Sequence, residues 1–188
     1  MRNGQLEENP FNGIPLFKVP QKIVRVLNSG EFQRILNAAV EPLWKASILL
    51  AKTAGLRRGE VLNLTVNDID FDQGKVIVQP KADTKHTWRW VVKDKERREL
   101  PLVDEVADLL IQLQMDLPAG QPYLLLPPPR YHHLMKLKAS GKLLDRVAKC
   151  PDGNCKRNWR VIFKKAKYST PLSMTCGPPV SPNGLNRE

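Results

Sequence analysis

The stretch TAGLRRGEVLNLTVNDIDF, residues 53–71, combines a glycine, two adjacent arginines and an apolar run. Gly55 suits the end of a helix that begins at Pro42, because glycine adopts the left-handed conformation at little cost. The residues that follow predict a second, short helix with Val61 and Leu62 directed inward. Two arginines at a helix start, where the dipole favours anions, raise the question of what their guanidinium groups bind.

The charge of the chain indicates a polyanionic partner. Its 188 residues carry a formal net charge of +11, and the sequence pI is about 9.8. Residues 130–167 hold twelve Lys or Arg against two Asp, and residues 81–98 hold seven basic against three acidic residues. Such clustering favours a nucleic acid over a merely soluble basic surface, through attraction and counterion release. Acidic proteins are the alternative partners.

Composition also limits the class of protein. Hydrophobic residues make up 41% of the chain, which argues against a disordered protein. No apolar run approaches the roughly 20 residues that a bilayer requires, and no signal peptide is evident. Three cysteines, an odd number, suit a reducing compartment, and Cys150 and Cys155 are too few for a zinc site. We expect a cytoplasmic, nucleoid-associated protein without metal, cofactor or membrane contact.

Periodicity predicts an α+β fold that is mostly helical, with a small three-stranded antiparallel sheet. The 3.6-residue spacing of apolar positions predicts helices at about 30–40, 42–55, 103–117, 132–149 and 158–167. β-Branched and alternating runs predict strands within 71–79, 86–93 and 97–102. We expect a lead-in at residues 1–27, a domain at 28–168 and an unstructured tail at 169–188.

These features together resemble the catalytic domain of the tyrosine recombinase, or phage integrase, family over roughly residues 9–167. The family pattern is Thr-Gly-Leu-Arg-x-x-Glu, followed by Leu-x-x-Leu-x-Trp-x-Asp-Ile-Asp and a basic hairpin that here ends in ELPL. The chain departs from it by inserting Ala54 and by placing Val66 where the family often has Trp. The resemblance implies an integrase-type domain that is incomplete at its C-terminus.

The resemblance also assigns roles, because the family cleaves and rejoins DNA through a covalent phosphotyrosine. Arg57 is implied to be the first catalytic arginine, since a guanidinium fork binds two phosphate oxygens at once. Arg58 points elsewhere on the helix and is expected to have no catalytic role. Glu60 would orient Arg57; the alternative is an ordinary helix carboxylate. The lysine that protonates the leaving 5′ oxygen is Lys93 or Lys81, and we favour Lys93, in the turn where the family places this group.

Further contacts to double-stranded DNA are expected from basic side chains in the hairpin and in the helix after it. These are Lys81, Lys85, Arg89, Lys95, Arg97, Arg130 and Lys136. Other recombinase protomers are the second class of expected partner.

The remaining groups of the family, a His-x-x-Arg box and a nucleophilic tyrosine, are not evident. The literal match, His86 with Arg89, precedes Lys93, and in a strand the two side chains would point to opposite faces. Tyr123 and Tyr131 come too early for the nucleophile. We therefore predict a recombinase family protein that takes part in recombination and integration but does not cleave DNA alone.

Three interpretations of this incomplete site stay open. The first is a truncated recombinase whose residues 169–188 are the product of a frameshift, which the coding DNA would test. The second is a non-enzymatic DNA-binding regulator or a decayed gene product with the same fold. The least favoured is an RNA-binding module that stacks bases on Trp88 and Trp90.

Overall fold

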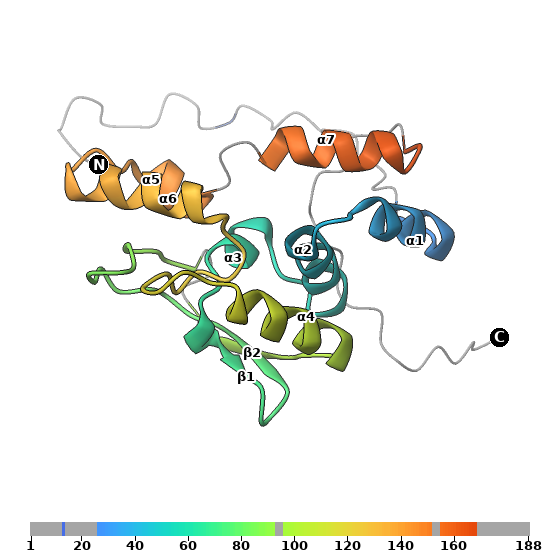
Figure 1. Cartoon of the computed structure of the whole chain (residues 1–188), viewed down its shortest axis with the longest axis horizontal. Coiled ribbons are helices and arrows are strands. Elements are labelled where there is room, and N and C mark those ends of the chain that lie inside the picture. The colour runs from blue at the N-terminus through green and yellow to red at the C-terminus, as the bar shows by residue number, and fades with distance from the viewer. Residues whose placement is uncertain (1–12, 14–25, 93–95, 152–154, 169–188) are drawn as a thin grey trace.

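The computed structural model describes residues 13, 26–92, 96–151 and 155–168. The predicted lead-in and the predicted tail at 169–188 therefore lie almost wholly outside the described residues. In chain order, the elements of this part are α1 (Ser29–Ala38), α2 (Pro42–Thr53), α3 (Arg58–Leu62), the 3-10 helix η1 (Val66–Asp68), β1 (Ile69–Asp70), β2 (Lys75–Val78), β3 (Arg98–Pro101), α4 (Asp104–Met115), α5 (Pro128–Ala139), α6 (Asp145–Lys149) and α7 (Cys155–Lys165) (Figure 1).

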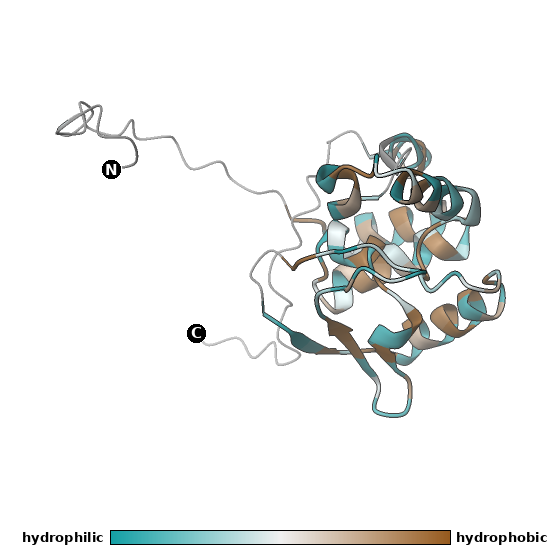
Figure 2. Ribbon diagram, turned by 90° about the vertical axis from the view of Figure 1, so that its left-hand side faces the viewer, coloured by the Kyte–Doolittle hydropathy of each residue, from teal (hydrophilic) through white to brown (hydrophobic). Residues whose placement is uncertain are grey.

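The three strands form one antiparallel sheet in the order β1-β2-β3, so the predicted α+β class with a small sheet is confirmed. Val76 of β2 stands opposite Ile69 of β1 and Leu100 of β3. Val76 and Val78 are buried, and Lys75 and Ile77, which alternate with them, are half-buried, as the two-residue period of a strand requires. The β1–β2 turn is hydrophilic and the strand after it hydrophobic (Figure 2).

The strand expected within 86–93 is wrong, and β1 takes its place in the sheet. Trp88, Trp90 and Val92 are all buried, which explains the alternating pattern. In the described residues, however, the ladder contact of this segment is one isolated bridge, between Trp90 and Lys81. An alternating pattern indicates only that every second side chain is buried. In this segment, side chains take the place of a neighbouring strand and bond many of the backbone N–H and C=O groups.

The helices follow the predicted ranges with one correction. Asn28 caps α1: its side chain accepts the Glu31 N–H at 2.8 Å, and the Glu31 carboxylate accepts the Asn28 N–H at 3.0 Å. The helix expected over 132–149 is two helices, α5 and α6. The chain turns between them at Gly141, whose φ of 68° a non-glycine residue rarely adopts.

Two hydrophobic clusters hold the described part together. The larger lies between α2, α4, the sheet and the segment before α5, with Leu50, Leu110 and Leu125 fully buried. The smaller joins α1, the start of α2 and α7, and its members include Trp44 and Ile162. Because α3 packs against α2 beside the larger cluster, its capping residue Arg57 stands directly next to the core.

Candidate phosphate-binding site

A buried carboxylate joins two arginines that lie far apart in the sequence. The Glu60 side chain is 3% exposed, and its Oε2 lies 2.5 Å from Nη2 of Arg98 on β3. The same oxygen accepts the Arg57 N–H at 2.8 Å, and Oε1 lies 3.4 Å from Nη1 of Arg57. We call Arg57, Glu60 and Arg98 the arginine–carboxylate site.

The local fold explains why Arg57 stands where it does. Gly55 has a φ of 61°, so the chain reverses directly after α2 and enters α3 with Arg57 as its capping residue. The Asn63 amide then ties the far end of α3 to its surroundings. It donates to Gly59 O at 2.8 Å and accepts the indole N–H of Trp88 at 3.0 Å.

The site has a surplus of positive charge. Two guanidinium groups share one carboxylate, and the Arg57 side chain remains 48% exposed. The Arg57 N–H is bonded to Glu60, and the half-exposed guanidinium group is the part of this residue that an anion could approach. Arg58 lies elsewhere, beside Trp44 and Trp159 at a shallow apolar pocket.

The two candidate lysines differ in what the structure shows. Lys81 is 9% exposed, and its Nζ lies 2.6 Å from Oδ1 of Asp68 and 3.0 Å from Gln79 O. Lys93 lies outside the described residues. The chain on either side of it is anchored, since Val92 is 1% exposed and β3 begins at Arg98 in the arginine–carboxylate site.

The other expected DNA contacts are spread over the surface. Lys85, Arg89 and Lys136 are exposed, and Lys95 lies outside the described residues. Arg97 is exposed and pairs with Glu99 at 2.7 Å, and this hydrogen bond, followed by that from Lys75, lowers the pKa of the Glu99 carboxyl.

Arg130 has a structural contact of its own. Its Nε donates to Pro151 O at 3.0 Å, and the side chain is half-buried. This bond ties the first turn of α5 to the chain that follows α6.

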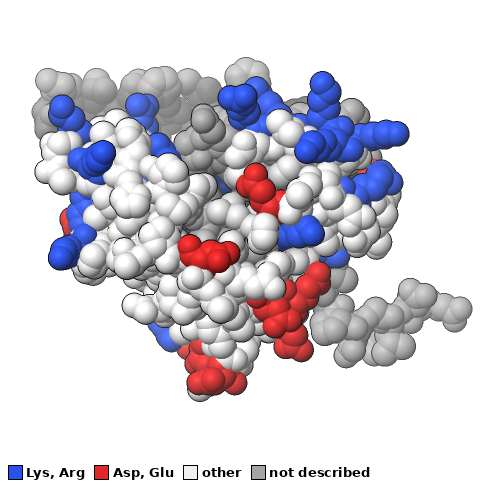
Figure 3. Space-filling model, in the orientation of Figure 1, with Lys and Arg blue, Asp and Glu red and all other residues white. Residues whose placement is uncertain are grey.

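Sequence reasoning missed a row of cations on α7. Arg157, Arg160 and Lys164 are exposed, whereas Trp159 and Ile162 of the same helix pack inward. Their spacing of three and four residues could have revealed this basic face. On the face drawn in Figure 3, Lys and Arg gather over the half that holds α5 and α7, and Asp and Glu over the half that holds β1 and α4.

Two of the three tyrosines serve the core. Burial raises the pKa of Tyr123, whose hydroxyl oxygen accepts the Trp88 N–H at 3.3 Å, and its ring stacks on Trp88 at a centroid distance of 4.1 Å. Burial also raises the pKa of Tyr131, which donates to His86 O. Tyr168 is half-buried and packs on Phe163.

Trp88 and Trp90 are 2% and 6% exposed, so this pair offers no surface for base stacking. The described residues hold no cluster of three or more potential metal ligands. Within the same part, no helix has the length and hydrophobicity needed to span a membrane.

Comparison with known proteins agrees with this architecture. Tyrosine recombinase XerC of Pseudomonas aeruginosa (strain LESB58) is 30% identical over 88 residues, which are 44% of this chain and 29% of XerC. The Integrase of Salmonella phage P22 is 31% identical over 84 residues, or 43% of this chain and 21% of that protein. The matched stretch thus spans less than a third of these curated relatives.

The fold matches as well. The crystal structure of XerA recombinase superposes with a TM-score of 0.56 at 19% identity, covering 84% of this chain and 48% of XerA. The model of the Phage integrase family matches residues 25–126, which include α1 to α4 and all three residues of the arginine–carboxylate site. The chain therefore belongs to the phage integrase family and has the fold of a tyrosine recombinase catalytic domain.

Proposed function

We propose that this chain binds double-stranded DNA in site-specific recombination and integration, and that Arg57 holds a backbone phosphate. The observation that carries the proposal is the buried Glu60 carboxylate between Arg57 and Arg98. A carboxylate in this place restricts the orientation of a half-exposed guanidinium group before any ligand arrives. A preorganised fork binds two phosphate oxygens with less loss of side-chain entropy than a free arginine would.

Each group has a role that its chemistry supports. Arg57 would neutralise charge on the nonbridging oxygens of the scissile phosphate, and Glu60 would keep it oriented. Lys93 would donate the proton to the 5′ oxygen as the bond from phosphorus to that oxygen breaks. Lys81 is the weaker candidate, because Asp68 holds its ammonium group and little of the side chain reaches solvent.

A nucleophile is the missing part of this set. Tyr123 and Tyr131 are buried and hydrogen-bonded, and Tyr168 packs on α7. We therefore propose that these 188 residues bind DNA without forming a covalent phosphotyrosine by themselves. A role as a regulator that occupies recombination sites is compatible with binding of this kind.

DNA-binding titrations over a range of salt concentrations test the proposal. The affinity should fall steeply as salt rises, because each neutralised phosphate releases counterions. Arg57→Lys, which keeps the charge but loses the fork, should weaken binding about tenfold, the loss expected for one charged hydrogen bond. Arg34→Lys, the same change at an exposed position of α1, is the control and should change the DNA affinity by less than about twofold.

Two outcomes would contradict the proposal. Equal effects of Arg57→Lys and Arg34→Lys would remove the assigned role of Arg57. Covalent capture of a nicked suicide substrate by this chain alone would overturn the claim that it binds without cleaving. A binding curve steeper than one site allows would support the expected partnership with further protomers.

A further inference from the structure

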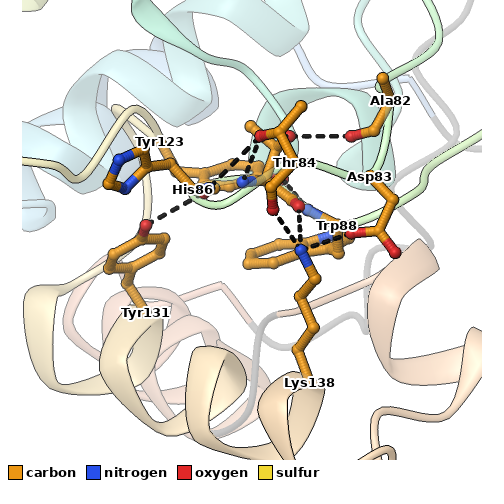
Figure 4. Close-up of polar contacts among 9 residues, drawn as sticks. Ala82, Asp83, Thr84, His86, Trp88, Tyr123, Tyr131 and Lys138 are labelled. Atoms are coloured by element: carbon orange, nitrogen blue, oxygen red, sulfur yellow. Dashed lines mark hydrogen bonds and ion pairs between the residues drawn. The ribbon is translucent and has the colours of Figure 1, made fainter.

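A lysine of α5 makes three polar contacts with the segment between β2 and β3. Lys138 reaches from α5 to this segment, where its Nζ donates to Thr87 O at 2.7 Å and to Thr84 O and forms an ion pair with Asp83 (Figure 4). An ammonium group has three N–H donors, and three acceptors surround this one. Lys138 is therefore fully used within the protein, and its side chain is 21% exposed.

The segment is also closed by bonds of its own. The Thr84 N–H donates to Thr87 O at 3.0 Å, and the Thr84 hydroxyl accepts the Thr87 N–H at 3.1 Å. The Thr87 hydroxyl donates to Ala82 O at 2.8 Å. We call residues 82–88 the clamped turn, because its inward carbonyl groups face α5 and Lys138 occupies two of them.

A second set of contacts holds the same turn from the core side. The Tyr131 hydroxyl, also on α5, lies 3.0 Å from His86 O and 3.0 Å from Gly120 O. Trp88 is stacked on Tyr123 and bonded to Asn63, so the end of the turn is anchored next to α3. The clamped turn is thus fixed by Asn63, which precedes it, and by the side chains of Tyr123, Tyr131 and Lys138, whose contacts span 35 to 55 residues of the chain.

The clamped turn and the residue that follows it carry two cations that none of these bonds uses. Lys85 lies within it and Arg89 directly after it, and both side chains are exposed. Among the described residues, neither has an ion pair, whereas the charge of Lys138 is compensated by Asp83. Lys85 and Arg89 are therefore available to an anionic partner, and Lys138 is not.

We propose that Lys138 is a positioning residue for DNA binding: it holds the clamped turn so that Lys85 and Arg89 face backbone phosphates together. This inference rests on the proposed function. Two cations on a loose loop would lose conformational entropy on binding, and the clamp removes that cost before the DNA arrives. Lys138 should then affect DNA affinity without contacting DNA.

A double-mutant cycle tests this role. The cation pair is removed by K85M/R89M, and the clamp is released by K138M, which keeps the apolar stem. In the parent chain, K85M/R89M should weaken binding about five- to tenfold. The slope of log affinity against log salt concentration should become shallower by nearly 2, as expected for the loss of two phosphate contacts. K138M should cause most of the same loss, and in the K138M background K85M/R89M should add less than about twofold.

Controls separate positioning from charge and from folding. Lys142 is exposed beyond the end of α5, so K142M removes one charge without touching the turn. It should leave the effect of K85M/R89M unchanged. T87V removes the hydroxyl that donates to Ala82 O and so loosens the turn while Lys138 stays in place. If K138M proves poorly folded, T87V should show the same loss of DNA affinity in its place.

The outcomes distinguish failure of the positioning role from failure of the proposed function. If the parent chain binds DNA and the losses from K138M and K85M/R89M simply add, the positioning role is refuted and the proposed function stands. If the parent chain shows no salt-dependent DNA binding, the proposed function itself is refuted. Loss of the effect of K85M/R89M in both K138M and T87V, but not in K142M, would establish the inference.

Discussion

Gly59 and Gly30 occupy the same position, the second residue, of two helices, yet replacement by alanine should have opposite effects. A β-carbon on Gly59 would lie 2.8 Å from the Lys149 carbonyl oxygen, a backbone atom at the end of α6. A β-carbon on Gly30 would lie no closer than 3.5 Å to any neighbour, and its closest neighbour is the side chain of Asn28. The first is a clash, whereas the second is an ordinary contact.

The magnitudes follow from these distances. Alanine in a helix stabilises the fold by about 0.5–1 kcal/mol relative to glycine, so Gly30→Ala should raise the free energy of unfolding by roughly that amount. Gly59→Ala has the same gain, but α3 and α6 must separate by several tenths of an ångström, which costs about 1–3 kcal/mol. The two variants should therefore differ by roughly 2 kcal/mol.

Urea unfolding of the parent chain and both variants measures this difference. For a chain of this length, 2 kcal/mol also corresponds to a shift of roughly 4–8 °C in Tm. The Asn63 amide donates to Gly59 O and, at 3.4 Å, to Lys149 O, and it accepts the indole N–H of Trp88. The displacement of α3 from α6 should therefore reach this indole and change the tryptophan fluorescence. Equal stability of the two variants would refute the close packing of α3 on α6.

Three further predictions concern polar contacts. Glu60→Ala should lower the free energy of unfolding by about 2–3 kcal/mol in urea titrations, less than for a fully buried ion pair because both arginines are partly exposed. Since burial raises the pKa of Tyr123, the folded chain keeps a proton that the unfolded chain releases near pH 10. Stability should fall as pH rises through about 10, and Tyr123→Phe should flatten this fall in urea midpoints measured at pH values around 8 to 11. Asn28→Ala should cost about 1 kcal/mol by removing the cap of α1, seen as a lower Tm.

Local patterns in the sequence predicted much of this architecture. The 3.6-residue period placed α2 and α4, and Gly55 marked the end of α2, since helix periodicity and backbone conformation depend on neighbouring residues. The Leu-Arg-x-x-Glu motif brought Arg57 and Glu60 together for the same reason, because residues three apart in a helix are neighbours.

The predictions that were wrong also have physical reasons. Alternation over residues 86–92 reported burial but could not tell whether a strand or a set of side chains satisfies the backbone. The break at Gly141 also lay inside a run of apparently helical residues. Neither case can be decided from neighbouring residues, because the missing partners are elsewhere in the chain.

The sequence by itself determined the family, the helices and the presence of Arg57 beside Glu60. Only the tertiary structure decided that Arg98, 38 residues beyond Glu60, completes the arginine–carboxylate site, and that Lys81 is held by Asp68. The structure likewise joined Lys138 to the clamped turn, where Thr87 lies 51 residues before it. The physical reason is that periodicity arises from local backbone geometry, whereas buried charges and carbonyl groups take the partners that folding brings to them.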